Sequence, residues 1–310
     1  TPDYAGGALE AVVQAGQQLW AVVTQPDKPK GRGKGIQMSP VKQCALKYGI
    51  PVFQPVKVRA PEAMEVLRGY GADVFVVAAF GQILTEEILS MPRYGCINIH
   101  ASLLPKYRGA SPIQWAILNG EKETGVTIMQ MDRGIDTGDM LFKCTVPVAQ
   151  RETGESLHDK LREAGAKLIA EALPRIEQGG FKPEKQKEEE ATYVSLLSKS
   201  MGHMDWSEDA VTLDRLVRGL NPWPSAYTSY HGKVLKIWEC EPVLEEEGDL
   251  REVPEGSMAG RIEKVARDAF YVRTGKGLLK VLQVQLEGKK RMPVKDFLLG
   301  YPLEEGNVLS

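Results

Sequence analysis

The chain has 310 residues, of which 43% are hydrophobic and 26% are charged, and its formal net charge is -2. A chain of this length exceeds what one core usually holds, so we expect two domains that each bury an apolar interior. The nearly balanced charge argues against a protein that coats nucleic acid, and no apolar run approaches the roughly 20 residues that cross a bilayer. These properties exclude a membrane protein and favour a cytoplasmic one whose nucleic-acid contacts are local.

The cysteines and histidines give no sign of a metal centre. The 4 cysteines lie far apart, and none has the paired spacing of a zinc knuckle or a redox motif. His158, His203 and His231 are all distant in sequence from His100. The glycine-rich stretch 31–35 lacks the spacing of a phosphate loop or a dinucleotide fingerprint. We therefore expect reduced thiols, no metal and no nucleotide-dependent chemistry.

Helical and strand-like patterns alternate along the first 180 residues, which indicates an α/β domain. In chain order the pattern predicts a helix ending at Gly16, a strand 19–24, a helix through Ala45, a strand near Val52, a helix 61–68, strands 73–79 and 96–100, a helix 113–118, strands 126–131 and 140–146, and a helix 156–176. The apolar run in 73–79 lacks polar alternation and predicts a parallel strand that is covered on both faces. Ser111 and Pro112 suit the start of the helix that follows them.

The composition changes after residue 180. Residues 181–191 are polar, charged and poor in core-forming side chains, as exposed linkers are. After one amphipathic helix, 212–219, short strand candidates follow at 233–240, 260–265, 270–273 and 278–285, separated by glycine and acidic turns. This pattern predicts a small β-barrel. We therefore expect a first domain at 1–180, a linker at 181–204 and a second domain at 205–310.

One short strand carries the most informative polar side chains. In the stretch Asn98, Ile99, His100 the two polar residues are two positions apart, so both project from one face of a strand and Ile99 from the other. The chain turns irregular directly afterwards, and in open α/β sheets ligands bind beyond the carboxyl ends of strands. An amide and an imidazole are therefore expected at a ligand-binding edge.

Asp136 lies in a glycine-flanked loop between two predicted strands of the same sheet, so its carboxylate can approach His100 from the side. A carboxylate beside an imidazole stabilises the protonated ring and fixes its orientation, and the amide of Asn98 can donate to a developing oxyanion. Taken singly, each residue also has a structural interpretation: a satisfied strand-end histidine, an edge asparagine and a turn-capping aspartate. The residues alone leave both interpretations open.

Two longer strings make the pattern specific. Residues 98–109, Asn-Ile-His-Ala-Ser-Leu-Leu-Pro-Lys-Tyr-Arg-Gly, followed by 131–138, Met-Asp-Arg-Gly-Ile-Asp-Thr-Gly, resemble the folate-dependent formyltransferases. The resemblance extends along nearly the whole chain through residues 1–5, 24–29, 221–224 and 291–295. These stretches are similar to the branch of the family whose members formylate methionine on initiator methionyl-tRNA.

The resemblance implies a Rossmann-like, mostly parallel sheet domain followed by a small β-barrel of the oligonucleotide-binding (OB) type. It implies that Asn98, His100 and Asp136 are catalytic and that 10-formyltetrahydrofolate is the formyl donor. The folate contacts it implies are Phe80, Gly81, Gln82, Ile83, Leu84, Ser102, Leu103, Leu104, Pro105, Asp132 and Gly134. The family also has an apolar, centrally placed strand just before the segment 1–5, so we expect such a strand to precede Thr1.

Two basic sets are candidates for tRNA contact. Lys28, Lys30, Arg32 and Lys34 lie in a stretch without core-forming residues, where glycines allow close backbone approach to phosphates. A second set in the barrel region comprises Lys276, Lys280, Lys289, Lys290, Arg291 and Lys295, of which 289–291 form the densest group. If these charges gather on one face they form a tRNA platform, and if they are scattered they serve solubility.

We expect the protein to be a monomer. Three other functions remain open at this point. A sugar-nucleotide formyltransferase shares the trio and the folate site but needs no basic loop at 28–34. A formyltetrahydrofolate hydrolase delivers the formyl group to water. A non-catalytic tRNA-binding module needs neither Asn98, His100 nor Asp136.

Overall fold

The computed structural model describes residues 2–30, 35–243 and 258–310. Contacts divide the chain into two compact units: residues 1–112, 123–147 and 157–195 form the first, and 113–122, 148–156 and 196–310 form the second. Residues 181–195, whose composition predicts a linker, thus belong to the first unit by their contacts. No helix in the described part of the chain is long and apolar enough to cross a membrane.

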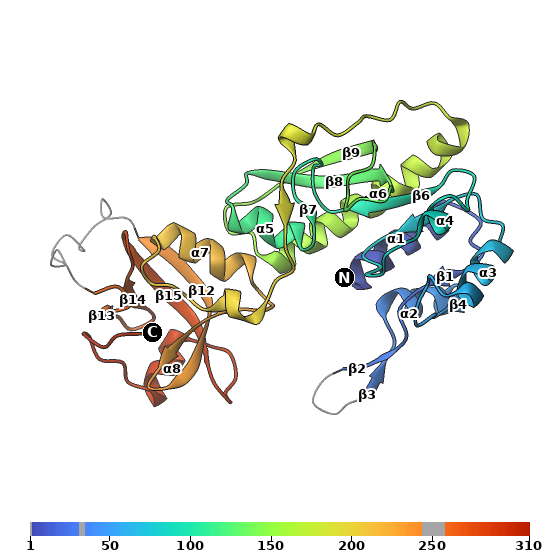
Figure 1. Cartoon of the computed structure of the whole chain (residues 1–310). Coiled ribbons are helices and arrows are strands. Elements are labelled where there is room, and N and C mark those ends of the chain that lie inside the picture. The colour runs from blue at the N-terminus through green and yellow to red at the C-terminus, as the bar shows by residue number, and fades with distance from the viewer. Residues whose placement is uncertain (1, 31–34, 244–257) are drawn as a thin grey trace. The chain divides into compact units, whose positions relative to one another are not determined.

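The first part of unit 1 is an α/β arrangement of short elements (Figure 1). Its helices are α1 (Pro2–Gln14), α2 (Pro40–Lys47), α3 (Pro61–Gly69) and α4 (Glu86–Leu89). Strands β1 (Val22–Val23) and β4 (Val52–Phe53) pair in parallel, and β2 (Lys28–Lys30) and β3 (Gly35–Gln37) form an antiparallel hairpin. Ser39 caps α2 by accepting a hydrogen bond from the Lys42 N–H at 3.3 Å, with Pro40 in the first turn.

The sheet that carries the candidate site has the order β5-β6-β8-β9. Its strands are β5 (Phe75–Val77), β6 (Cys96–His100), β8 (Glu123–Gln130) and β9 (Met140–Pro147). Strand β5 runs parallel to β6, whereas the pairs β6/β8 and β8/β9 are antiparallel. The sheet is therefore mixed. Strands β8 and β9 follow each other through the short loop 131–139, as antiparallel neighbours can.

Helix α6 (Gly154–Gln178) runs along this sheet (Figure 1). A glycine allows the close approach: a Cβ on Gly165 would lie 2.8 Å from the Tyr4 hydroxyl and 3.2 Å from Cγ2 of Ile99. After α6 the chain returns along the sheet, and β10 (Tyr193–Val194) pairs in parallel with β7 (Arg108–Gly109). The short 3-10 helix η1 (Glu188–Glu190) precedes β10.

A largely apolar cavity of about 340 Å³ is lined by α1, β1 and β5, with Leu9, Val22 and Val76 among the lining residues. Within the described ranges β1 pairs only with β4, and β5 pairs only with β6, so both strands present an unpaired edge. Val76 is 38% exposed, although its apolar run predicts a strand covered on both faces. The difference arises because this side chain borders the cavity instead of a packed neighbour.

Unit 2 is a six-stranded antiparallel sheet with the order β11-β12-β15-β14-β13, with β16 added to β15. The strands are β11 (Ala226–Tyr230), β12 (Lys233–Val243), β13 (Ile262–Val265), β14 (Phe270–Arg273), β15 (Leu278–Leu286) and β16 (Met292–Pro293). Helices α7 (Ala210–Gly219) and α8 (Val294–Gly300), most of α5 (Pro112–Leu118) and the 3-10 helix η2 (Lys199–Gly202) complete it. Its core gathers buried Trp206, Leu213, Phe270 and Phe297.

Candidate active site

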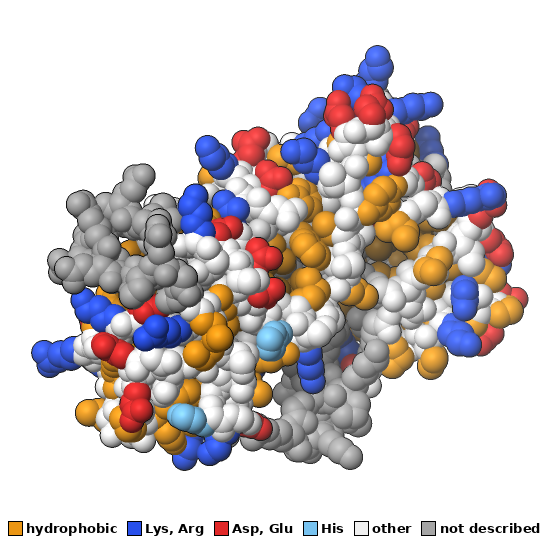
Figure 2. Space-filling view, turned by 60° about the vertical axis from the view of Figure 1, so that its left-hand side comes forward, with side chains coloured by type: hydrophobic (Ala, Val, Ile, Leu, Met, Phe, Trp, Pro, Cys, Tyr) orange, Lys and Arg blue, Asp and Glu red, His pale blue; other side chains and the backbone are white. Residues whose placement is uncertain are grey.

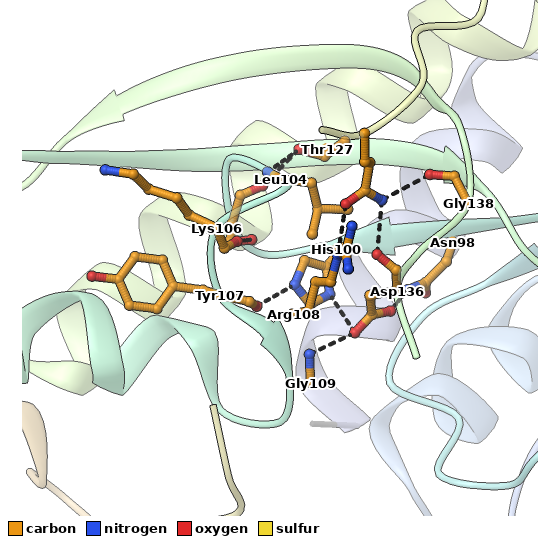
Figure 3. A network of polar contacts seen from close by, with 12 residues as sticks. Asn98, His100, Leu104, Lys106, Tyr107, Arg108, Gly109, Thr127, Asp136 and Gly138 are labelled. Carbon is orange, nitrogen blue, oxygen red and sulfur yellow. Dashed lines mark hydrogen bonds and ion pairs between the residues drawn. The ribbon is translucent and has the colours of Figure 1, made fainter. Parts of the chain in front are cut away.

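Strand β6 presents Asn98 and His100 on one face and Ile99 on the other, as the alternation of a strand requires. Ile99 is buried against α6, where Gly165 leaves room for it. Asn98 and His100 consequently point away from α6, toward the loop that joins β8 and β9 (Figure 3).

Both ring nitrogens of His100 face acceptors. Its Nε2 lies 2.9 Å from the carbonyl oxygen of Tyr107, and its Nδ1 lies 3.5 Å from Oδ2 of Asp136. The ring is 6% exposed, so water does not replace either partner freely. Both contacts become hydrogen bonds at once only when both nitrogens carry hydrogen.

The Asp136 carboxylate lies between three donors (Figure 3). Its Oδ2 accepts a hydrogen bond of 2.9 Å from the backbone N–H of Gly109, and its Oδ1 lies 3.4 Å from Nδ2 of Asn98. Asp136 has a φ of 54°, a left-handed conformation that aspartate tolerates better than most residues. The structure thus brings the three side chains of the predicted trio together, with the carboxylate in the middle.

The loop that carries Asp136 has its own internal support. Oδ1 of Asp132 accepts hydrogen bonds from the Gly134 N–H at 3.0 Å and from the Thr137 hydroxyl at 2.6 Å. A Cβ on Gly134 would lie 1.9 Å from that hydroxyl oxygen, so the turn excludes a side chain there. Among the predicted folate contacts, Asp132 and Gly134 therefore build the first half of the loop.

The predicted folate segment 80–84 lies beside the same loop, because Arg133 of the loop pairs with Glu86 at the start of α4. Ile83 is 81% exposed, whereas Phe80 and Leu84 pack against a cluster around Ile88. Gly81 follows Phe80 with a φ of 73°. Gln82 accepts a hydrogen bond of 2.8 Å from the Val58 N–H. Its Nε2 is buried and has no hydrogen-bond partner in the part of the chain that the structure describes.

The predicted folate segment 102–105 is placed differently. Ser102 is fully buried, and its hydroxyl donates to the Lys106 carbonyl at 2.7 Å. Leu104 is 2% exposed, and its N–H donates to the Thr127 hydroxyl at 3.1 Å. Leu103 and Pro105 are half-buried. The structure therefore does not bring Ser102 and Leu104 to the surface. Both residues instead stabilise the buried turn that follows β6.

The two basic sets lie in different units. Lys28 and Lys30 belong to β2, and Arg32 and Lys34 lie outside the described residues. Lys289, Lys290 and Arg291 are exposed in the turn between β15 and β16. Figure 2 shows basic and acidic side chains interspersed on the face in view, in keeping with the nearly balanced net charge.

Arg291 lies against an aromatic ring that the sequence analysis did not single out. Its guanidinium carbon is 4.9 Å from the ring centroid of Trp238, and Nζ of Lys236 is 5.7 Å from the same ring. Both β12 residues project from the outer face of the sheet, since their neighbours Leu235 and Ile237 are buried. Lys280 is instead neutralised by Glu241 at 3.3 Å. An aromatic ring flanked by two cations is a known arrangement for nucleic-acid contact.

Cys96 at the start of β6 is close in sequence to the trio but is not a nucleophile. Burial raises the pKa of this thiol to about 12, and its sulfur contacts the Ile88 carbonyl. In residues 2–30, 35–243 and 258–310 no group of three or more histidine, cysteine, aspartate or glutamate side chains has the arrangement of a metal site.

Comparison with known families covers both units. Residues 3–173 match the family model described as "Formyl transferase", and residues 196–302 match "Formyl transferase, C-terminal domain". The methionyl-tRNA formyltransferase of Agathobacter rectalis is 54% identical over 310 residues, covering 100% of this chain and 97% of that protein. The same-named protein of Lachnospira eligens is 51% identical, covering 100% of this chain and 98% of that protein.

Solved structures with the same fold are more distant. The N-formyltransferase of Helicobacter canadensis, in complex with folinic acid and dTDP-3-aminofucose, is 18% identical with a TM-score of 0.63, covering 93% of this chain and 96% of that one. HypX of Aquifex aeolicus, in complex with tetrahydrofolic acid, is 21% identical with a TM-score of 0.58, covering 86% of this chain and 47% of that one. These likenesses show the fold alone.

Proposed function

The chain belongs to the methionyl-tRNA formyltransferase family, and we propose that Asn98, His100 and Asp136 carry the formyl transfer that it performs. The enzyme places a formyl group on the amine of methionine bound to tRNA, for translation initiation. The observation that supports the proposed site is the position of the Asp136 carboxylate, which faces both Asn98 and His100.

The proposed donor is 10-formyltetrahydrofolate, which acts as a co-substrate. Its pterin lies against residues 80–84 and the loop 132–136, where exposed Ile83 and Ile135 offer apolar surface. Two proteins of the same fold were solved in complex with tetrahydrofolic acid and with folinic acid, which supports a folate as the class of donor. Ser102, Leu103, Leu104 and Pro105 help to hold the donor by fixing the chain at the end of β6.

In the first step the methionine amine attacks the formyl carbon, a carbon–nitrogen bond forms, and the carbonyl electron pair moves onto oxygen. Nδ2 of Asn98 and Nδ1 of His100 donate to this oxyanion. Their contacts to Asp136, at 3.4 and 3.5 Å, are long and therefore weak. The oxyanion can replace the carboxylate on both donors, while the Gly109 N–H keeps the carboxylate in place.

In the second step the attacking nitrogen loses a proton and the folate nitrogen N10 gains one. The bond from the formyl carbon to N10 breaks, its electron pair stays on N10, and the oxyanion becomes the amide carbonyl of formylmethionyl-tRNA. His100 relays the proton through Nδ1, which faces the reacting side, while Nε2 remains on the Tyr107 carbonyl. Asp136 holds the ring in this orientation between turnovers through its contact with Nδ1.

The proposed tRNA contacts are Lys28, Lys30, Arg32 and Lys34 in unit 1 and Lys289, Lys290 and Arg291 in unit 2. Selection of the initiator tRNA, a cytoplasmic location and a monomeric state are part of the same proposal. The exposed position of residues 289–291 supports the second contact, since phosphates reach such side chains without rearrangement of the sheet.

Incubation with 10-formyltetrahydrofolate and charged initiator tRNA tests the donor and the acceptor together. We expect formylmethionyl-tRNA to form, and formate release without tRNA would identify a hydrolase instead. Asn98→Ala and His100→Ala are expected to abolish turnover while tRNA binding, measured by filter retention, survives. Near-normal turnover in either variant would refute the assignment of the trio.

A further inference from the structure

The segment after α6 contacts the loop that carries Asp136 through one side chain. Nε2 of Gln186 donates to the carbonyl oxygen of Asp136 and to that of Gly138, both at 2.7 Å. The same amide uses its oxygen as an acceptor, since Nε of Arg108 donates to Oε1 of Gln186 at 2.9 Å. A single side chain therefore holds the carbonyl groups of Asp136 and Gly138 and is itself held by Arg108.

Arg108 is a firm anchor for this amide because it is 1% exposed and makes further bonds. Its Nη1 donates to Oε2 of Glu188 at 2.8 Å and to the Tyr193 hydroxyl at 2.6 Å. The hydrogen bond from Arg108 lowers the pKa of Glu188, so the pair remains charged at neutral pH. Pairing of β7 with β10 holds the backbone on either side.

The two halves of the loop thus have different supports. Asp132 fixes the first half by bonding Gly134 and Thr137. The second half begins at Asp136, whose left-handed φ of 54° is less favourable than ordinary backbone for a residue with a side chain. The two carbonyl oxygens at Asp136 and Gly138 carry like partial charges, and the amide hydrogens of Gln186 lie between them. Removing this donor frees the backbone that aims the carboxylate.

We propose that Gln186 is a positioning residue for Asp136: through the two carbonyl bonds it fixes the backbone that directs the carboxylate toward His100. The inference rests on the proposed function, because it matters for turnover only if Asp136 serves the reaction. Gln186 is 50 residues from Asp136 in sequence, so the return of the chain after α6 completes the site.

The test compares Gln186→Met and Gln186→Glu in the full-length enzyme. Methionine keeps the length of the side chain but donates nothing. Glutamate keeps the acceptor for Arg108 but turns an oxygen toward the two carbonyls. Gln178→Met serves as the matched control, because Gln178 is exposed at the end of α6 in the same unit.

Steady-state kinetics with both substrates varied, together with thermal unfolding, give the readout. We expect kcat to fall about 10- to 100-fold in both Gln186 variants, as small misplacements of catalytic groups do, with KM for donor and tRNA unchanged. Full activity of Gln186→Glu would show that only the Arg108 bond matters and would overturn the proposal. A change confined to KM, or normal kcat in Gln186→Met, would also overturn it.

The Asn98→Ala variant separates this inference from the proposed function. If Asn98→Ala loses turnover and Gln186→Met does not, the inference alone fails. If Asn98→Ala keeps turnover, the proposed site fails and the inference fails with it. A further outcome is that the activity of Gln186→Met per total protein falls only as far as its folded fraction falls, with a normal kcat per folded molecule. That result would show a purely structural role and contradict the proposal.

Discussion

Nδ1 of His100 lies 3.5 Å from Oδ2 of Asp136, which is farther than the 2.9 Å that separates the same oxygen from the Gly109 N–H. The carboxylate is therefore anchored by the backbone and only loosely engaged by the imidazole. In the proposed mechanism this asymmetry leaves the ring available to a reacting oxygen while the Asp136 carboxylate stays in place.

The first prediction concerns the charge of that carboxylate. Asp136→Asn removes the charge and directs an amide, with two donor hydrogens, toward the donors Gly109 and Asn98. We expect kcat to fall by about 100-fold or more, in the range of a lost acid–base partner. Single-turnover measurement of formyl transfer checks this, and thermal unfolding shows whether the variant is folded. A kcat within threefold of the parent enzyme would contradict the role of the charge.

The second prediction concerns Arg291, which lies over the Trp238 ring on the outer face of the six-stranded sheet. If it contacts a tRNA phosphate, Arg291→Ala should raise KM for tRNA and reduce the slope of log KM against log salt by roughly 0.7 to 0.9. Arg267→Ala is the charge-matched control, since Arg267 is exposed in the turn between β13 and β14. An unchanged salt slope in Arg291→Ala, or an equal change in both variants, would rule out a specific contact.

The third prediction concerns the start of α7. Asp209 accepts a hydrogen bond from the Thr212 N–H at 2.9 Å, and this N-cap bond lowers the pKa of the carboxyl group. Asp209→Ala should cost about 1 kcal/mol of unfolding free energy at pH 7. Because the folded pKa is the lower one, the contribution is present above the unfolded pKa of about 3.9 and is lost as pH falls through the folded pKa.

Urea unfolding of the parent protein and of Asp209→Ala at several pH values tests this cap. The difference between the two proteins should be constant near neutral pH and should shrink toward pH 3. A difference that grows on acidification would contradict the assigned direction of the shift.

The fourth prediction concerns the apolar cavity lined by α1, β1 and β5. Addition of about six strand-forming apolar residues before Thr1 should raise the melting temperature, because a strand there would pair open edges and cover Leu9, Val22 and Val76. A Gly/Ser extension of equal length is the control. Equal melting temperatures for the two extended proteins would show that the cavity does not accept a strand.

Much of the fold follows from local patterns. The strand predicted at 96–100 has the same bounds as β6, because its alternation of apolar and polar side chains is regular. The long helix predicted at 156–176 lies within α6. Strand β11 (Ala226–Tyr230) is not among the predicted strands. Its alternate residues are buried where it pairs with β12, a contact between strands that a local pattern does not encode.

The sequence points to the candidate site only where a motif marks it. Asn98, His100 and Asp136 lie in strings with a recognisable order, whereas Gln186 lies in a charged stretch that predicts a linker. Its contact with the Asp136 loop depends on a return of the chain across the sheet, which no local pattern encodes. The sequence does not predict the inward position of Ser102 either. Its hydroxyl donates to the backbone carbonyl of Lys106, and every residue carries such a carbonyl.

The second unit is assembled from three separate stretches of chain, and this limits how the protein can be divided. Residues 113–122 and 148–156 belong to it together with 196–310. Arg151 from the middle stretch pairs with buried Asp214 of α7 at 2.9 Å, and a Cβ on Gly154 would lie 2.7 Å from the Gly219 carbonyl. A gene fragment starting at residue 196 would remove Arg151 from Asp214, leaving it with Arg218 and the Cys240 thiol, and would uncover the surface of α7 that these stretches protect. The second unit is therefore compact, but it cannot be exchanged between proteins at a single junction in the chain.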